Sequence, residues 1–212
     1  MSSPPAESRR FAALVPVKPP ARGKSRLVGL DDDVRRELAA AFALDTVAAC
    51  LASSRIAAVL VATDDASFSA RLAALGCAAI PDGVTGDLNA SLGQAAAEAR
   101  RRWPDLQPVA LCADLPALRP DDLDAALAQV GDEPAFVPDT AGVGTTLYTA
   151  GWERFDPRFG VGSRAAHEEQ AFAIGLEAAT LRRDVDDLDD LRAAMDLGVG
   201  ARTGALTATL RA

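Results

Sequence analysis

The sequence contains few histidines and cysteines and no long apolar run, and each shortage excludes a class of protein. A single histidine, His167, makes a histidine-rich metal centre impossible and disfavours a His-based catalytic triad. The three cysteines form no CxxC pair, which argues against a zinc site and for a reducing compartment. No apolar run reaches the roughly 18 residues of a membrane span, and the N-terminus lacks a signal-peptide core. A cytoplasmic protein without a membrane partner is therefore expected.

Positive charge is also scarce. The 212 residues include 22 basic and 30 acidic side chains, and the formal net charge of −8 disfavours nonspecific binding to nucleic acid or anionic membranes. Only Lys18 and Lys24 are lysines, and both lie in the segment 16–27, which also contains prolines and a glycine. An acidic protein binds phosphates by concentrating positive charge locally or by recruiting a divalent cation with carboxylates.

Strand-like and helix-like segments alternate along the chain, which predicts an α/β sandwich. Continuous apolar runs at 11–17 and 56–63 predict strands covered on both faces, and 176–181 is expected to form the last strand. Acidic residues at 184–190 are expected to lead into one terminal helix. Residues 1–10 are polar and predict a flexible tail, and 11–212 show no repeat or linker, which indicates a single domain.

Three acidic residues near predicted strand ends are candidate metal ligands. Asp114 follows the apolar run 109–113, and Mg²⁺ binds one or two carboxylates together with phosphate oxygens. In an extended segment Asp184 and Asp186 point to the same side and repel each other unless a cation lies between them. The alternative is structural: Asp114 caps a turn, and the acidic run after Arg183 caps a helix or is solvated.

The basic loop and two glycine-rich segments are candidate anion sites. Lys18, Lys24 and Arg26 follow the first predicted strand, although the loop has no Walker A motif. Glycines at 142–144 and 160–162 let backbone N–H groups approach an anion. The alternatives are a solvated basic loop and two ordinary turns.

Two further polar residues have either a functional or a structural role. Asn89 either contacts a nucleotide or caps a helix, and His167 is either catalytic or structural.

Six segments, read in order, resemble one known family. They are LVPVKPPARGKSRL, GDLNASL, LCADLPAL, GVGTTLY, RFGVGSRAAH and RDVDDLDDL, within about residues 11–197. The series resembles the 2-phospho-L-lactate and phosphoenolpyruvate guanylyltransferases of coenzyme F-420 biosynthesis, in the MobA-like nucleotidyltransferase superfamily. The resemblance implies a three-layer α/β/α sandwich with a mostly parallel, Rossmann-like sheet. It also implies transfer of GMP from GTP to the phosphate of a three-carbon acid, with release of pyrophosphate.

The resemblance also assigns roles by position. Acceptor binding falls to Thr145, Gly160 and Ser163. Asp114 becomes the central Mg²⁺ ligand, with Asp184 and Asp186 completing the metal site. Lys24 contacts the GTP phosphates as a catalytic residue with Lys18 and Arg26 in support, and Asn89 lies near the nucleotide. One departure is visible, because a Pro/Lys/Arg loop replaces the glycine-rich opening loop usual in the superfamily.

The Arg-rich and Ala-rich composition suggests an actinobacterial source, and in that lineage the resemblance implies phosphoenolpyruvate as the acceptor. The alternatives are 2-phospho-L-lactate, a molybdopterin or sugar phosphate, a non-enzymatic nucleotide-binding module, and a phosphatase or receiver-like domain phosphorylated on Asp114. No residue type separates the two small acids. The oligomeric state is not fixed either, and a homodimer is one option.

Overall fold

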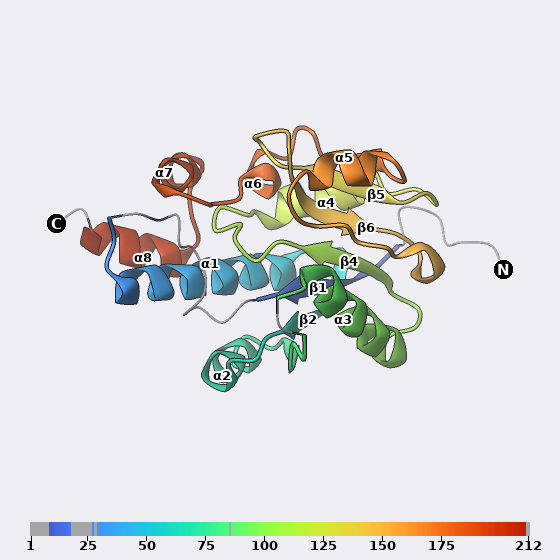
Figure 1. Cartoon of the computed structure of the whole chain (residues 1–212), viewed down its shortest axis with the longest axis horizontal. Coiled ribbons are helices and arrows are strands. Elements are labelled where there is room, and N and C mark those ends of the chain that lie inside the picture. The colour runs from blue at the N-terminus through green and yellow to red at the C-terminus, as the bar shows by residue number, and fades with distance from the viewer. Residues whose placement is uncertain (1–8, 18–26, 28, 85, 211–212) are drawn as a thin grey trace.

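The computed structural model describes residues 9–17, 27, 29–84 and 86–210, and these form one sheet with helices on both faces (Figure 1). The strands are β1 (Phe11–Pro16), β2 (Ile56–Ala62), β3 (Ala78–Ile80), β4 (Gln107–Leu111), β5 (Ala135–Pro138), β6 (Thr145–Thr149) and β7 (Phe172–Ala173). Their order is β3-β2-β1-β4-β6-β5-β7. Only β6 runs antiparallel to its neighbours among the described strands, which confirms the mostly parallel sheet.

The helices connect these strands in the expected alternation. They are α1 (Asp32–Ala52), α2 (Ala66–Ala73), α3 (Leu88–Arg102), α4 (Pro120–Leu127), α5 (Ser163–Glu168), α6 (Ala179–Arg182), α7 (Leu188–Leu197) and α8 (Ala201–Leu210), with a short 3₁₀ turn at Trp152–Arg154. None of the helices in the described part of the chain is long and apolar enough to span a membrane.

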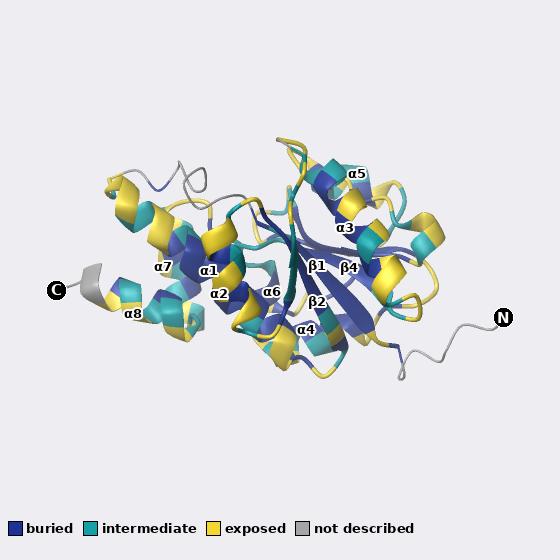
Figure 2. Cartoon of the chain, turned by 90° about the horizontal axis from the view of Figure 1, so that it is seen from below, coloured by how far each residue is buried: buried dark blue, intermediate teal, exposed yellow. Residues whose placement is uncertain are grey.

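The alternation of side chains along the strands builds two apolar layers. Phe11, Ala13 and Val15 of β1 belong to a cluster shared with α1, α2 and α4. Leu14 points the other way, into a cluster shared with α3. Figure 2 shows α3 and α5 on one side of the sheet and α1, α2 and α4 on the other, with the strands between them buried. The three-layer α/β/α sandwich is therefore confirmed.

A third apolar cluster attaches α7 and α8 to α1. It includes Leu38 and Phe42 of α1 and Leu191 of α7. Asp45 of α1 is buried and accepts a hydrogen bond of 2.8 Å from the backbone N–H of Thr203. The carboxylate thus satisfies a donor in the first turn of α8, where negative charge is favourable.

The C-terminal quarter differs from the sequence-based expectation. Residues 176–181 do not form the last strand, because α6 occupies 179–182 and β7 is the last strand. Ala178 and Leu181 are buried while Leu176 is exposed, and burial at a spacing of three favours a helix. Instead of the single terminal helix that was expected, the chain forms two helices, α7 and α8, which are separated at Gly198. Of the expected tail, residues 1–8 lie outside the described residues, and Arg9 is buried and pairs with Asp132 at 2.8 Å.

Candidate active site

Polar side chains gather at the carboxyl edge of the sheet. Asp114 follows the end of β4, and Asp139 follows β5 directly. Because β6 is antiparallel, its first residue lies at the same edge, and Thr145 pairs in register with Pro138. The strand order therefore brings together residues from three strands, as expected for a ligand site in an α/β sheet.

Asp139 holds the first glycine loop in place. Its buried carboxylate accepts hydrogen bonds from the backbone N–H groups of Val143 (2.9 Å) and Gly144 (2.8 Å). A Cβ on residue 144 would collide with this carboxylate, so glycine is required there. The sequence did not single out Asp139, although it follows an apolar strand in the same way as Asp114.

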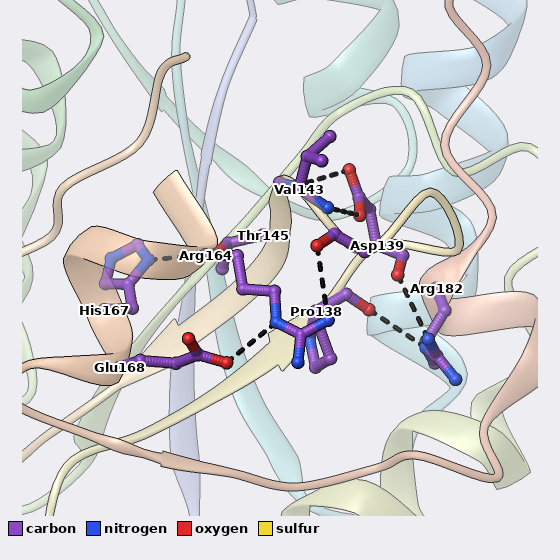
Figure 3. A network of polar contacts seen from close by, with 10 residues as sticks. Pro138, Asp139, Val143, Thr145, Arg164, His167, Glu168 and Arg182 are labelled. Carbon is purple, nitrogen blue, oxygen red and sulfur yellow. Dashed lines mark hydrogen bonds and ion pairs between the residues drawn. The ribbon is translucent and has the colours of Figure 1, made fainter. Parts of the chain in front are cut away.

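Arginines connect this loop to the rest of the site. The backbone N–H of Arg164 donates to the Val143 carbonyl at 3.2 Å, and its guanidinium donates to the Gly142 carbonyl at 3.2 Å. On the other side, the Arg182 guanidinium donates to the carbonyls of Pro138 (3.0 Å) and Asp139 (3.1 Å) (Figure 3). The two glycine segments that the sequence pointed out are thus parts of one hydrogen-bonded assembly.

The predicted acceptor residues lie within this assembly. Thr145 and Ser163 are both buried, with exposed fractions of 5% and 3%. The backbone N–H of Ser163 donates to the Gly160 carbonyl at 3.1 Å. Gly160 and Gly162 have φ angles of +134° and +72°, which side-chain-bearing residues rarely adopt, so this turn depends on glycine.

His167 connects the two glycine loops through hydrogen bonds. Its Nδ1 lies 2.9 Å from the Thr145 hydroxyl (Figure 3). Its Nε2 accepts the backbone N–H of Arg158 at 2.9 Å. No partner of this histidine could be predicted from the sequence, because Thr145 and Arg158 lie 22 and 9 residues away along the chain.

The predicted metal ligands form an acidic group at the same edge. The backbone N–H of Val185 donates to the Asp114 carbonyl at 3.1 Å, which brings Asp184 and Asp186 beside Asp114. Burial first, and then the negative charges of Asp114, Asp186 and Asp139, together raise the pKa of the Asp184 carboxyl to about 7. Four carboxylates therefore repel one another here, an arrangement that a cation would stabilise.

These carboxylates do not form a complete metal cage. In the described part of the chain, no group of three or more His, Cys, Asp or Glu side chains is arranged to hold a metal ion. The acidic group still fits Mg²⁺, since this ion keeps several waters and is bound in proteins by one or two carboxylates together with substrate phosphates. The assignment of Asp114, Asp184 and Asp186 as ligands stays a prediction.

The acidic run after Asp186 is structural, as its alternative reading predicted. Asp187 caps α7 by accepting hydrogen bonds from the backbone N–H groups of Asp189 (2.9 Å) and Asp190 (3.0 Å). Asp190 pairs with Arg183 at 3.2 Å.

Asn89 lies against the second glycine loop. Its carboxamide donates to the Phe159 carbonyl at 3.0 Å and accepts the Phe159 N–H at 2.8 Å. The helix cap belongs to Asp87, whose carboxylate accepts from the N–H groups of Asn89 and Ala90 at 3.0 Å each. A nucleotide contact of Asn89 stays a prediction, and the bonds seen here are to the residue that precedes Gly160.

The three cationic residues assigned to the nucleotide phosphates, Lys18, Lys24 and Arg26, lie outside the described residues. Val17, which precedes them, is buried and donates its N–H to the Ala62 carbonyl at 2.8 Å, at the carboxyl edge of the sheet. Their predicted roles stay predictions.

Comparisons with known proteins identify similar sequences. A family model described as "Guanylyl transferase CofC like" matches residues 11–208. A Streptomyces coelicolor protein named phosphoenolpyruvate guanylyltransferase is 48% identical over 206 residues, covering 95% of this chain and 97% of that protein. A Thermomonospora curvata protein of the same name is 47% identical, with 95% and 90% covered.

Solved structures support the fold. A Desulfovibrio desulfuricans G20 protein, provisionally described as a nucleotide-diphospho-sugar transferase, matches with a TM-score of 0.68 at 18% identity, covering 95% of each chain. A 4-diphosphocytidyl-2C-methyl-D-erythritol synthase matches with a TM-score of 0.61 at 11% identity, covering 89% of this chain and 99% of that one. At these identities the likeness concerns the architecture alone.

Proposed function

The chain belongs to the CofC-like guanylyl transferase family, and on this basis we propose that it transfers GMP from GTP to the phosphate of phosphoenolpyruvate. The products are enolpyruvoyl-diphospho-guanosine and pyrophosphate. The named relatives match nearly the full length of this chain, and each is called phosphoenolpyruvate guanylyltransferase. The reaction places the protein in coenzyme F-420 biosynthesis.

The position of Asp139 is the observation that carries the proposal. Its charge acts on Asp184 in the acidic group, and its carboxylate fixes the loop that ends at Thr145. The carboxylates proposed to hold the metal and the residues proposed to bind the small acid are thus adjacent, as a reaction between two phosphate compounds requires. A non-enzymatic nucleotide-binding module has no need for this adjacency.

The chemistry needs positioning and charge neutralisation rather than proton transfer. An oxygen of the acceptor phosphate attacks the α-phosphorus of GTP in line, the bond to the β-phosphate breaks, and pyrophosphate leaves. The attacking oxygen is already anionic, so no general base is required. The main obstacle is repulsion between two polyanions.

Three groups of residues position the two reactants and reduce the repulsion between them. Thr145, Ser163 and the Gly160 turn bind and orient the acceptor acid. Lys24, supported by Lys18 and Arg26, neutralises the departing pyrophosphate. Asp114, Asp184 and Asp186 hold Mg²⁺, which when bound offsets the negative charge of both reactants. A cytoplasmic location and a homodimer stay predictions.

Release of pyrophosphate tests the proposal. The protein is incubated with Mg²⁺, with GTP, ATP or CTP, and with phosphoenolpyruvate or 2-phospho-L-lactate. We expect release only with GTP, and faster with phosphoenolpyruvate. Release with 2-phospho-L-lactate alone would move the proposal to that acid, and no release with either acid would contradict it.

Asn89→Ala is expected to weaken binding of the acceptor and not of GTP. The substitution removes two hydrogen bonds to the Phe159 backbone, each worth about 1 kcal/mol, so KM for phosphoenolpyruvate should rise by up to about thirtyfold. Steady-state kinetics with each substrate varied in turn measures both KM values. Asp87→Ala is the matched control, because it weakens the same helix start without touching Phe159. A rise in KM for GTP alone would show that Asn89 contacts the nucleotide instead.

A further inference from the structure

The imidazole of His167 is held at both nitrogens and on its faces. The side chain has no exposed surface. Its ring stacks on Tyr148 (centroids 4.7 Å apart, 23° between planes) and on Phe136 (5.8 Å, 25°), and the Phe159 ring meets it edge-on at 5.4 Å. With both hydrogen bonds made, the ring has one orientation, so its protons are fixed in space.

The hydrogen bonds determine the tautomer. A backbone N–H only donates, so Nε2 must accept from Arg158 and carries no proton in the neutral ring. The proton is therefore on Nδ1, which donates to the Thr145 oxygen. Burial lowers the pKa of His167 to about 4; the Ser163 backbone and Asp156 oppose this shift, and Arg158 adds to it.

This tautomer has a consequence for Thr145. The hydroxyl oxygen accepts from His167, so its own hydrogen is not used in that bond. In the described part of the chain, no other hydrogen-bond partner of this hydroxyl is present. The hydrogen is therefore available to an anionic ligand beside the Gly160 turn.

We infer that His167 is a positioning residue of the acceptor site: it turns the Thr145 hydroxyl into a hydrogen-bond donor for the acceptor acid and fixes the peptide that begins the second glycine loop. The inference rests on the proposed function for the identity of the acid. It assigns His167 no proton transfer, because the Nε2 lone pair is occupied by Arg158 and the Nδ1 proton by Thr145.

The tautomer can be measured directly, because the chain contains one histidine. Protein labelled with ¹⁵N-histidine gives a single imidazole spin system by NMR. We expect a protonated Nδ1 and an unprotonated Nε2 at pH 7, with resonances that shift on titration with phosphoenolpyruvate and not with GTP alone. A protonated Nε2, or no response to phosphoenolpyruvate, would overturn the inference. This measurement needs neither a variant nor turnover.

Three variants separate positioning from packing. His167→Phe keeps a ring in the stack and removes both hydrogen bonds, so KM for phosphoenolpyruvate should rise about tenfold or more, with KM for GTP changed less than about twofold. His167→Asn restores a donor near the Nδ1 position and should recover part of the loss. Phe136→Leu is the control: it weakens the same stack without touching either hydrogen bond, and should lower Tm while leaving both KM values unchanged.

The outcomes keep this inference distinct from the proposed function. If wild-type protein forms no product, the proposed function fails, and the NMR titration still tests His167. If wild-type protein is active but His167→Phe leaves the acceptor KM unchanged, or Phe136→Leu raises it equally, the positioning role is wrong. If His167→Phe does not fold, the NMR experiment decides alone.

Discussion

We expect replacement of Asp114 with Asn to lower guanylyl transfer on the order of a thousandfold and to leave the fold intact. Asn has nearly the same shape, and the observed bond from the Val185 N–H uses the backbone carbonyl, which the variant keeps. The variant loses the charge proposed to hold Mg²⁺ beside the reacting phosphates. Stabilisation of transition-state charge by a metal is worth several kcal/mol, and each 1.36 kcal/mol is tenfold in rate. Initial rates of pyrophosphate release at saturating substrates measure the effect.

A neighbouring carboxylate provides the control. Asp187 lies in the same acidic stretch but caps α7, a position where Asn serves equally well. Asp187→Asn should therefore keep near-normal turnover. Near-normal activity of Asp114→Asn at saturating Mg²⁺ would contradict the metal assignment.

The free energy of unfolding is expected to fall by about 3 kcal/mol between pH 6.5 and pH 4 because of His167 alone. Burial holds the pKa of the folded imidazole at about 4, against an ordinary value of 6.5. Between these values the unfolded chain binds a proton and the folded chain does not, so acid favours unfolding by about 1.4 kcal/mol per pH unit. Above pH 6.5 this contribution is fully present, and below pH 4 it is lost.

Comparing the free energy of unfolding of the wild-type protein with that of His167→Phe isolates the contribution of His167. Asp184 acts in the opposite sense, since its folded pKa is raised to about 7 and protonation there favours the folded state. Urea unfolding is therefore measured from pH 4 to pH 7.5 for the wild-type protein and for His167→Phe, and the two curves are subtracted. We expect a difference that changes by about 3 kcal/mol over this window. A difference independent of pH would contradict the buried neutral imidazole.

The elements of the sheet could be predicted from the sequence because their signals are local. Apolar runs predicted β1, β2 and β4. The segment 176–181 was mistaken for a strand, because a single turn of helix in a short apolar stretch has too few residues to show its period.

Only part of the candidate site could be predicted from the sequence. Asp114 was singled out by its place after a strand, and Thr145 and Ser163 by the resemblance to a known family; the structure places them at one edge of the sheet. Asp139 was not singled out, although it follows an apolar strand and its donors, Val143 and Gly144, are only four and five residues away. The role of His167 was left open, because its partners Thr145 and Arg158 lie 22 and 9 residues away along the chain and are brought to it only by the fold.

Mass spectrometry of the reaction product tests the central claim most directly. Wild-type protein is incubated with GTP, phosphoenolpyruvate and Mg²⁺, and Asp114→Asn is treated identically. The account predicts a compound with the mass of enolpyruvoyl-diphospho-guanosine, formed in equal amount to pyrophosphate and almost absent with the variant. GDP or GMP without any joined product would contradict it, because the protein would then hydrolyse the nucleotide rather than transfer it.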